Sequence, residues 1–415
     1  MNSSRNVGHF ARYATLIMAL GIGSLALSPA ALAEEKIGAK VGKPLQAAQE
    51  LAQKKDLNGA LAKVKEAEAI SSKTPFEQFK IDQFKVFIQL QRGDYGSAGK
   101  AMEATLSSGF LSAEEAAKTH KSLSQIAFHE KDYNKVIEYG KKYLQYAPGD
   151  LETQLLIIQA QYTLKDYASS ATGLRSVISS AEKSGRDVKE EWLQLLMSAE
   201  YEQKNLPGVA DVLEMLLKRY PSQKYWRDRT QMLQDLPDLG DRENFEILRL
   251  MNENNVLQDA GEYIELAELA IQLGLPGEAK SVLDKGFANQ TLGVGDGADR
   301  QKRLLTMATR QGADDSKALA QVEKETAAAA SGDPDVKTGE AYLNYGKVDA
   351  AVTALQRGLG KGNVTNPDSA NLQLGIALFR QGKIDEAKTA FAAVTQKKAL
   401  SDVARLWTLH IQQKK

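Results

Sequence analysis

Apolar residues recur along this chain at the three- and four-residue spacing of amphipathic helices, and short polar turns interrupt them at regular intervals. The clearest stretch has Leu378 in front of Gly382, followed by Ala387, Phe391 and Val394 at i, i+4 and i+7. Glycine is well suited to the left-handed conformation that closes a helix. The pattern therefore predicts two packed helices joined by a tight turn.

A related turn recurs along most of the chain. Its copies begin at Gly93, Lys131, Lys165, Asn205, Gly274, Gly346 and Gly382. We align each hairpin on the small residue just inside its second helix, which gives Ala60, Ala98, Val136, Ser170, Ala210, Ala279, Ala351 and Ala387. Successive positions are separated by 38, 38, 34, 40, 69, 72 and 36 residues. A period of this length predicts an all-α solenoid, in which each hairpin packs on its neighbours.

Two of these intervals, 69 and 72 residues, are each close to two periods. They predict degenerate hairpins centred near Phe245 and Asp315, for a total of about ten hairpins. Residues 34–285 are then the N-terminal repeats and residues 335–397 the C-terminal repeats. The region between them, 286–334, contains glycine-rich and alanine-rich connections and is a degenerate repeat and a candidate hinge.

The last segment, residues 398–415, has an amphipathic pattern between Leu400 and Ile411 and ends in polar residues. A terminal helix with one polar side covers the open end of a solenoid. We therefore expect a C-terminal capping helix.

The N-terminus has the features of an export signal. Arg5 and Arg12 supply positive charge, residues 13–27 are mainly apolar, and the small-x-small sequence that ends at Ala33 suits a signal peptidase. The alternative is a membrane anchor, but the apolar run falls short of the ~20 residues that span a bilayer. We expect a signal peptide over residues 1–33 that is cleaved after Ala33.

The composition of the chain limits the cellular compartment and the kinds of partner that we expect. The chain has no cysteine, which excludes disulfides, thiolate metal sites and a lipid-modified N-terminal cysteine. Without residues 1–33 there are 53 − 2 = 51 basic and 53 acidic residues, a net charge of −2. Such a chain has no long-range field that attracts nucleic acid. With no later apolar segment of membrane-spanning length, these features predict a periplasmic protein without a lipid anchor.

Motifs for catalysis or metal binding are missing from the sequence. The three histidines after the signal peptide, His120, His129 and His410, do not form a His-Glu-x-x-His motif. Residues 293–299 lack the acidic spacing of a calcium loop, and no Gly-x-Ser-x-Gly elbow occurs. The repeats run to about residue 397, which leaves no room for a catalytic domain after them. We expect a non-enzymatic protein with no cofactor and no metal.

The small residue in the first helix, the Gly-Asp-Tyr-like turn and the alanine that opens the second helix resemble the tetratricopeptide repeat. The resemblance covers most of residues 44–397 and implies a right-handed α-solenoid. In that family the first helices line a concave face that binds a protein or peptide. Carried over by alignment, the resemblance implies that these residues face the groove: Lys80, Gln83, Phe87, Lys118, Lys121, Gln125, His129, Glu152, Gln159 and Tyr162.

A narrower resemblance lies between Tyr220-Pro221 and Lys285-Gly286, which is similar to periplasmic repeat proteins encoded beside TonB–ExbB–ExbD systems. It implies a scaffold of the cell envelope that is accessory to TonB-dependent uptake. An adaptor for outer-membrane, polysaccharide or pilus assembly and export fits the same fold. A third alternative, a small-molecule-binding protein or enzyme, would need an apolar pocket with convergent polar groups. The sequence leaves these alternatives open.

Overall fold

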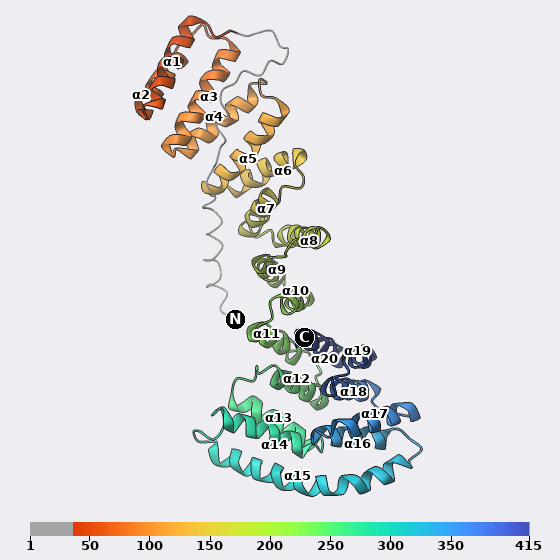
Figure 1. The fold of residues 1–415 in the computed structure, drawn as a ribbon. Helices are drawn as coiled ribbons and strands as arrows, with labels where there is room; N and C mark the ends of the chain where they lie inside the picture. Colours follow the sequence, from red (N-terminus) through yellow and green to blue (C-terminus); the bar gives the residue numbers. More distant parts are fainter. Residues whose placement is uncertain (1–35, 415) are drawn as a thin grey trace. The chain divides into compact units, whose positions relative to one another are not determined.

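The computed structural model describes residues 36–414, so the expected signal peptide lies outside the described residues. The described residues form twenty α-helices and no strand (Figure 1). They divide into two compact units, the first ending at Val188 and the second beginning at Lys189. The expected all-α solenoid of helical hairpins is confirmed. No helix among these residues is long and apolar enough to cross a membrane.

The first unit consists of four consecutive hairpins, each packed on the next (Figure 1). Its helices are α1 (Ala39–Gln53), α2 (Leu57–Glu68), α3 (Pro75–Arg92), α4 (Tyr95–Ser107), α5 (Ala113–His129), α6 (Tyr133–Tyr146), α7 (Leu151–Thr163) and α8 (Tyr167–Lys183). The odd-numbered helix is the first of each hairpin, and the even-numbered helix is the second.

The turn inside each of these hairpins has the same two-residue geometry. Its first residue has a positive φ, and its second is an aspartate whose carboxylate accepts a hydrogen bond from the third backbone N–H of the following helix. The positive-φ residues are Lys55, Gly93, Lys131 and Lys165, and the aspartates are Asp56, Asp94, Asp132 and Asp166. This geometry explains why the turn motif recurs.

The residue four positions after the N-cap lies on the buried side of the second helix. Ala60, Ala98, Val136 and Ser170 hold this position in the first unit, and all are completely buried. The alignment on Ala210 was wrong by one residue. Asn205 is the N-cap there, so the equivalent position is Val209, which is buried while Ala210 is only half-buried.

The second unit has twelve helices (Figure 1). They are α9 (Glu190–Glu202), α10 (Leu206–Arg219), α11 (Gln223–Gln234), α12 (Asp241–Glu253), α13 (Ala260–Gln272), α14 (Pro276–Ala288), α15 (Ala298–Ala327), α16 (Asp333–Asn344), α17 (Val348–Lys361), α18 (Pro367–Arg380), α19 (Ile384–Ala392) and α20 (Lys398–Gln413). The degenerate hairpin expected near Phe245 is present as α11 and α12, with Phe245 in the core.

The hairpin expected near Asp315 is absent, because α15 is one helix of 30 residues. Spacing alone suggested a hairpin here, and Gly312 is a candidate turn residue, but no residue of α15 adopts the left-handed conformation that closes a helix. Gly312 stays helical and is buried beside the start of α14, where an added Cβ would lie 3.7 Å from the backbone nitrogen of Gly277. The glycine allows a close approach and does not make a turn. The hinge expected at residues 286–334 stays a prediction.

Helix α20 does more than cap the last hairpin. It packs on α19 and α18 as expected, but also on α10 and α12, which are far away in the sequence. The side chain of Trp407 is completely buried, and the indole N–H of Trp226 donates to the Gln413 side chain at 3.1 Å. The helix therefore closes the second unit on itself, and the expectation of a cap on an open end is corrected.

A network of buried charges lies around α12. The Arg249 guanidinium donates two hydrogen bonds of 2.6 Å to Glu278 of α14, and others to Glu246 at 2.9 Å and to Gln373 of α18 at 2.8 Å. Gln373 donates to the second Glu246 oxygen at 2.6 Å. Arg242 connects Glu246 to Glu340 of α16. Burial raises the pKa of Glu246, although both arginines act in the opposite direction.

We expect Gly93→Ala to lower the free energy of unfolding by about 1 kcal/mol, since a side chain destabilises the left-handed conformation. An alanine Cβ would meet no atom within 4 Å there, so the cost is conformational and not steric. Gly149→Ala is the matched control, because it also has open space and its φ is not positive. Urea unfolding followed by circular dichroism tests this. Equal effects of the two substitutions would contradict it.

We expect Arg249→Ala to destabilise the second unit by about 3–5 kcal/mol, because Glu246 and Glu278 would stay buried without their cation. Arg405→Ala is the control: its half-exposed pairs with Glu214 and Asp402 are worth about 0–1 kcal/mol. Hydrogen exchange read peptide by peptide would show faster exchange in residues 241–380 of the first variant. Unchanged exchange there would refute the role of the network.

Candidate functional site

The first helices of three consecutive hairpins, α3, α5 and α7, carry the predicted groove residues. Side-chain caps fix where each of them begins. Thr74 and Ser112 form capping boxes with Glu77 and Glu115, and Asp150 caps α7. Helices α5 and α7 also contact each other directly, so their side chains meet across the hairpin boundary.

Three of the predicted residues lie together between α5 and α7. The ammonium of Lys121 is 2.9 Å from Glu152 and 3.0 Å from Asp150, and it lies 5.4 Å from the ring centre of Tyr143. The Gln125 amide donates to Glu152 at 3.2 Å. Burial alone would lower the pKa of Lys121, but the two carboxylates outweigh it and the pKa is raised. The Lys121 charge is therefore fully compensated within the protein.

Lys80 on α3 has a different environment. Its ammonium donates to the neutral side chain of Gln83 at 3.0 Å and lies 5.2 and 5.1 Å from the ring centres of Phe76 and Phe79. Phe110, in the connection before α5, contacts both rings. Burial lowers the pKa of Lys80, and the distant Glu115 only partly opposes this. No carboxylate of the described residues forms an ion pair with Lys80.

The remaining predicted residues are dispersed. Lys118 is exposed and pairs with Glu114 of its own helix at 2.6 Å. Phe87 packs against the core of the first two hairpins, and His129 lies 4.6 Å from the Tyr95 ring centre to centre. Gln159 is half-buried on α7. The Tyr162 ring contacts the ring of Tyr167 at 5.2 Å.

Sequence reasoning missed several residues of this surface, namely Phe76, Phe110, Tyr143 and Asp150. Helix-position offsets carried over from a repeat family cover the middle of the first helix. They do not cover a helix cap such as Asp150 or a connection such as the one that holds Phe110. The Thr-Pro-Phe-Glu sequence at residues 74–77 was a signal for a capped helix start that would have placed Phe76.

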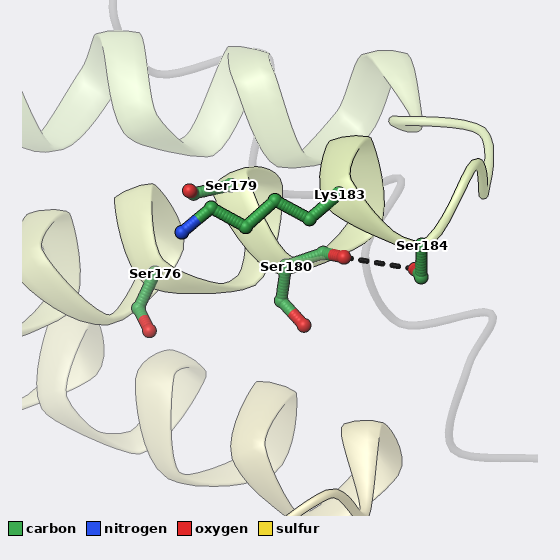
Figure 2. Close-up of a pocket in the computed structure, with 5 residues that line it drawn as sticks. All are labelled: Ser176, Ser179, Ser180, Lys183 and Ser184. Carbon is green, nitrogen blue, oxygen red and sulfur yellow. Dashed lines mark hydrogen bonds between the residues drawn. The ribbon is translucent and has the colours of Figure 1, made fainter.

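Two depressions of the surface are lined mainly by polar residues. One of about 470 Å³ lies along the end of α8 and is lined by Ser176, Ser179, Ser180, Lys183 and Ser184. Figure 2 shows these side chains along one helix, with the Ser184 hydroxyl donating to the Ser180 carbonyl at 2.8 Å. A second, of about 490 Å³, lies beside Arg227, which is paired with Glu262. Residues 36–414 contain no group of three or more potential metal ligands.

Comparison with known proteins identifies one repeat directly. Residues 369–397 match the model of the tetratricopeptide repeat, and this segment spans α18, the turn at Gly382 and α19. No curated protein matches the chain. The family-model match supports a tetratricopeptide repeat protein, as the turn motif predicted.

Several solved structures are similar to this chain at low identity. A tetratricopeptide repeat protein from Parabacteroides merdae has 13% identity and a TM-score of 0.32, over 66% of this chain and 100% of its own. The TPR2AB domain of yeast Sti1 in complex with pHSP90 has 15% identity and a TM-score of 0.31, over 65% and 98%. The apo form of RapI has 14% identity and a TM-score of 0.29, over 78% and 99%.

Acid should weaken the first unit through Glu103 of α4, which accepts hydrogen bonds from Tyr139 at 2.5 Å and Lys135 at 2.9 Å on α6. These bonds lower the pKa of Glu103 in the folded state. The stability they contribute is therefore present above the pKa of about 4.3 that glutamate has in the unfolded chain, and it is lost as the pH falls below that value. We expect Glu103→Gln to lose less stability than wild type between pH 6 and pH 3, by under about 1 kcal/mol because the site is partly solvated.

The measurement is urea unfolding at a series of pH values, with Glu114→Gln as the control. Glu114 pairs only with exposed Lys118 on its own helix. The Glu114 variant should keep the wild-type pH dependence. A Glu103 variant that also kept it would show that the contact between α4 and α6 is not linked to protonation.

Proposed function

We propose that this chain is a non-enzymatic scaffold of the cell envelope that binds a protein segment along α3, α5 and α7. The observation that supports this most is the row of polar side chains on successive first helices. Lys80, Lys121, Gln125 and Glu152 are oriented by neighbours on the surface. Side chains that are already ordered lose little entropy when a partner binds.

Lys80 is the group on this surface best suited to a partner's charge. The ammonium of Lys121 is balanced by two carboxylates and that of Lys118 by one, whereas Lys80 has only a neutral amide and aromatic rings. A carboxylate from a partner would form the ion pair that Lys80 lacks within the protein and would offset the cost of burying its charge. The half-buried rings of Phe76 and Phe110 beside it would receive an apolar side chain. The preferred ligand is thus a segment with an acidic group next to an apolar residue.

The cellular setting rests on the sequence. The signal-peptide features and the absence of cysteine support the periplasm. The resemblance around residues 220–286 supports an accessory role in TonB-dependent uptake. An adaptor for assembly or export machinery is the second candidate, because the same surface would serve it equally well.

The test is a crosslinked pull-down of the mature chain from its own envelope fraction, followed by mass spectrometry. We expect Lys80→Glu to lower recovery of the specific partner at least tenfold, since it places the new glutamate against the acidic group of the partner. Lys65→Glu, on the exposed side of the second helix α2, is the matched control and should have no effect. Circular dichroism confirms that both variants fold.

The identity of the recovered protein then decides the cellular role. TonB–ExbB–ExbD components would support the uptake role, and outer-membrane or export machinery would support the adaptor role. A partner recovered equally by Lys80→Glu would refute the assignment of this surface. Recovery of no specific partner would refute the scaffold itself.

A further inference from the structure

Helix α15 has a long face that no other described element covers. Its other side packs on α14 and α16, through buried Gln301, Ala308, Gly312 and Leu319 (Figure 1). The acidic side chains Asp315 and Glu323 also face this packed side, where they accept hydrogen bonds from the hydroxyls of Tyr345 and Tyr342. Two of the five acidic side chains of α15 are therefore turned inward, while Asp299, Asp314 and Glu325 are exposed.

The outward side carries a regular row of cations, which we call the basic stripe. Its members are spaced by seven residues and are all exposed: Arg303, Arg310, Lys317 and Lys324. Arg303 and Arg310 each lie two residues after a buried residue, Gln301 and Ala308 respectively, which is about 200° around the helix. They are therefore on the side opposite the packed one. None of the four forms an ion pair with another described residue, whereas Arg300 at the same helix pairs with Glu268 at 2.9 Å.

Small residues lie beside the basic stripe with the same spacing. Thr306, Ala313 and Ala320 are exposed three positions after successive cations. Met307, whose side chain is 37% exposed, lies between the first two cations on the same side. Small side chains let a second helix approach closely, and flanking charges of this spacing set the partner in coiled coils. The face has the features of an unpaired helix–helix seam.

We propose that the outer face of α15 binds an acidic amphipathic helix of a partner protein. Residues seven apart on an α-helix drift by about 20° per repeat, and a partner helix that crosses at about 20° follows them. Glutamates with the same spacing would then meet each cation in turn. An anionic membrane would also attract cations on one side of a helix, but the side chains beside this row are mostly small, whereas helices that bind membrane surfaces present large apolar ones. This site is in the second unit and is independent of the surface proposed above.

The probe is a fluorescent helical peptide of 28 residues with glutamate at every seventh position and alanine or leucine beside it. A second peptide has the same composition with the glutamates out of register. Binding to the mature chain is measured by fluorescence anisotropy at low and physiological salt. We expect the in-register peptide to bind at least tenfold more tightly, with an affinity that falls as salt rises.

The stripe variant carries Arg303→Glu, Arg310→Glu, Lys317→Glu and Lys324→Glu. Its control has the same charge change at exposed lysines outside α15: Lys65, Lys100, Lys218 and Lys337 each changed to Glu. The stripe variant should lose at least tenfold in affinity for the glutamate peptide and gain affinity for a peptide with lysine at the same positions. The control should keep the wild-type preference.

Three outcomes would overturn the proposal. Equal binding of the two glutamate peptides would show that the spacing of the glutamates along the helix does not matter for binding. An equal loss of affinity in the stripe variant and its control would show that net charge alone, and not the basic stripe, determines binding. Stripe-dependent binding to phosphatidylglycerol vesicles without any peptide preference would assign the face to a membrane surface instead.

Discussion

The structure depends on one constraint, the tight turn that sets two helices antiparallel and close together. Its first residue must adopt the left-handed conformation, and the residue that follows begins the second helix. Five turns place aspartate or asparagine at that N-cap, and lysine or glycine before it. Three turns have no capping side chain, at Leu275, Lys347 and Lys383, and all three have glycine in the left-handed position. Each turn therefore has at least one of the two stabilising features.

Once the turn is formed, the position four residues after the N-cap must fit against the first helix. This requirement explains why alanine is frequent there, and why glycines in the first helix recur opposite large side chains. Gly375 and Gly339 are examples: an added Cβ would lie 2.4 Å from Phe391 and 2.5 Å from Leu355. The hairpin is thus determined mainly by residues close together in the sequence, which is why much of it can be predicted from the sequence.

The features that the sequence did not predict are those that depend on distant partners or on a missing signal. Counting periods suggested a hairpin near Asp315, but Gly312 stays helical, no residue there has a positive φ, and α15 is one helix of 30 residues. Nothing local shows that α20 returns to α10 and α12, because that packing joins the Gln413 side chain to the Leu217 carbonyl of α10 across 196 residues. At the candidate site, Lys121, Gln125 and Glu152 contact one another on adjoining helices, and their role in binding stays a prediction. Helix offsets could not show which lysine has no carboxylate partner, because the neighbours of each lysine include side chains from helix caps and connections.

The two units distribute charge in different ways, and this difference determines where a partner can act. In the first unit, ion pairs between hairpins are half-buried at the surface, as between Lys121 and Glu152, so a partner competes with existing contacts. In the second unit, Arg249 and Glu246 are used internally, in contacts that solvent does not reach. On α15, by contrast, Arg303, Arg310, Lys317 and Lys324 are exposed and form no ion pair with a described residue. A partner can therefore reach these cations without breaking an existing ion pair, which it cannot do at the buried network around α12.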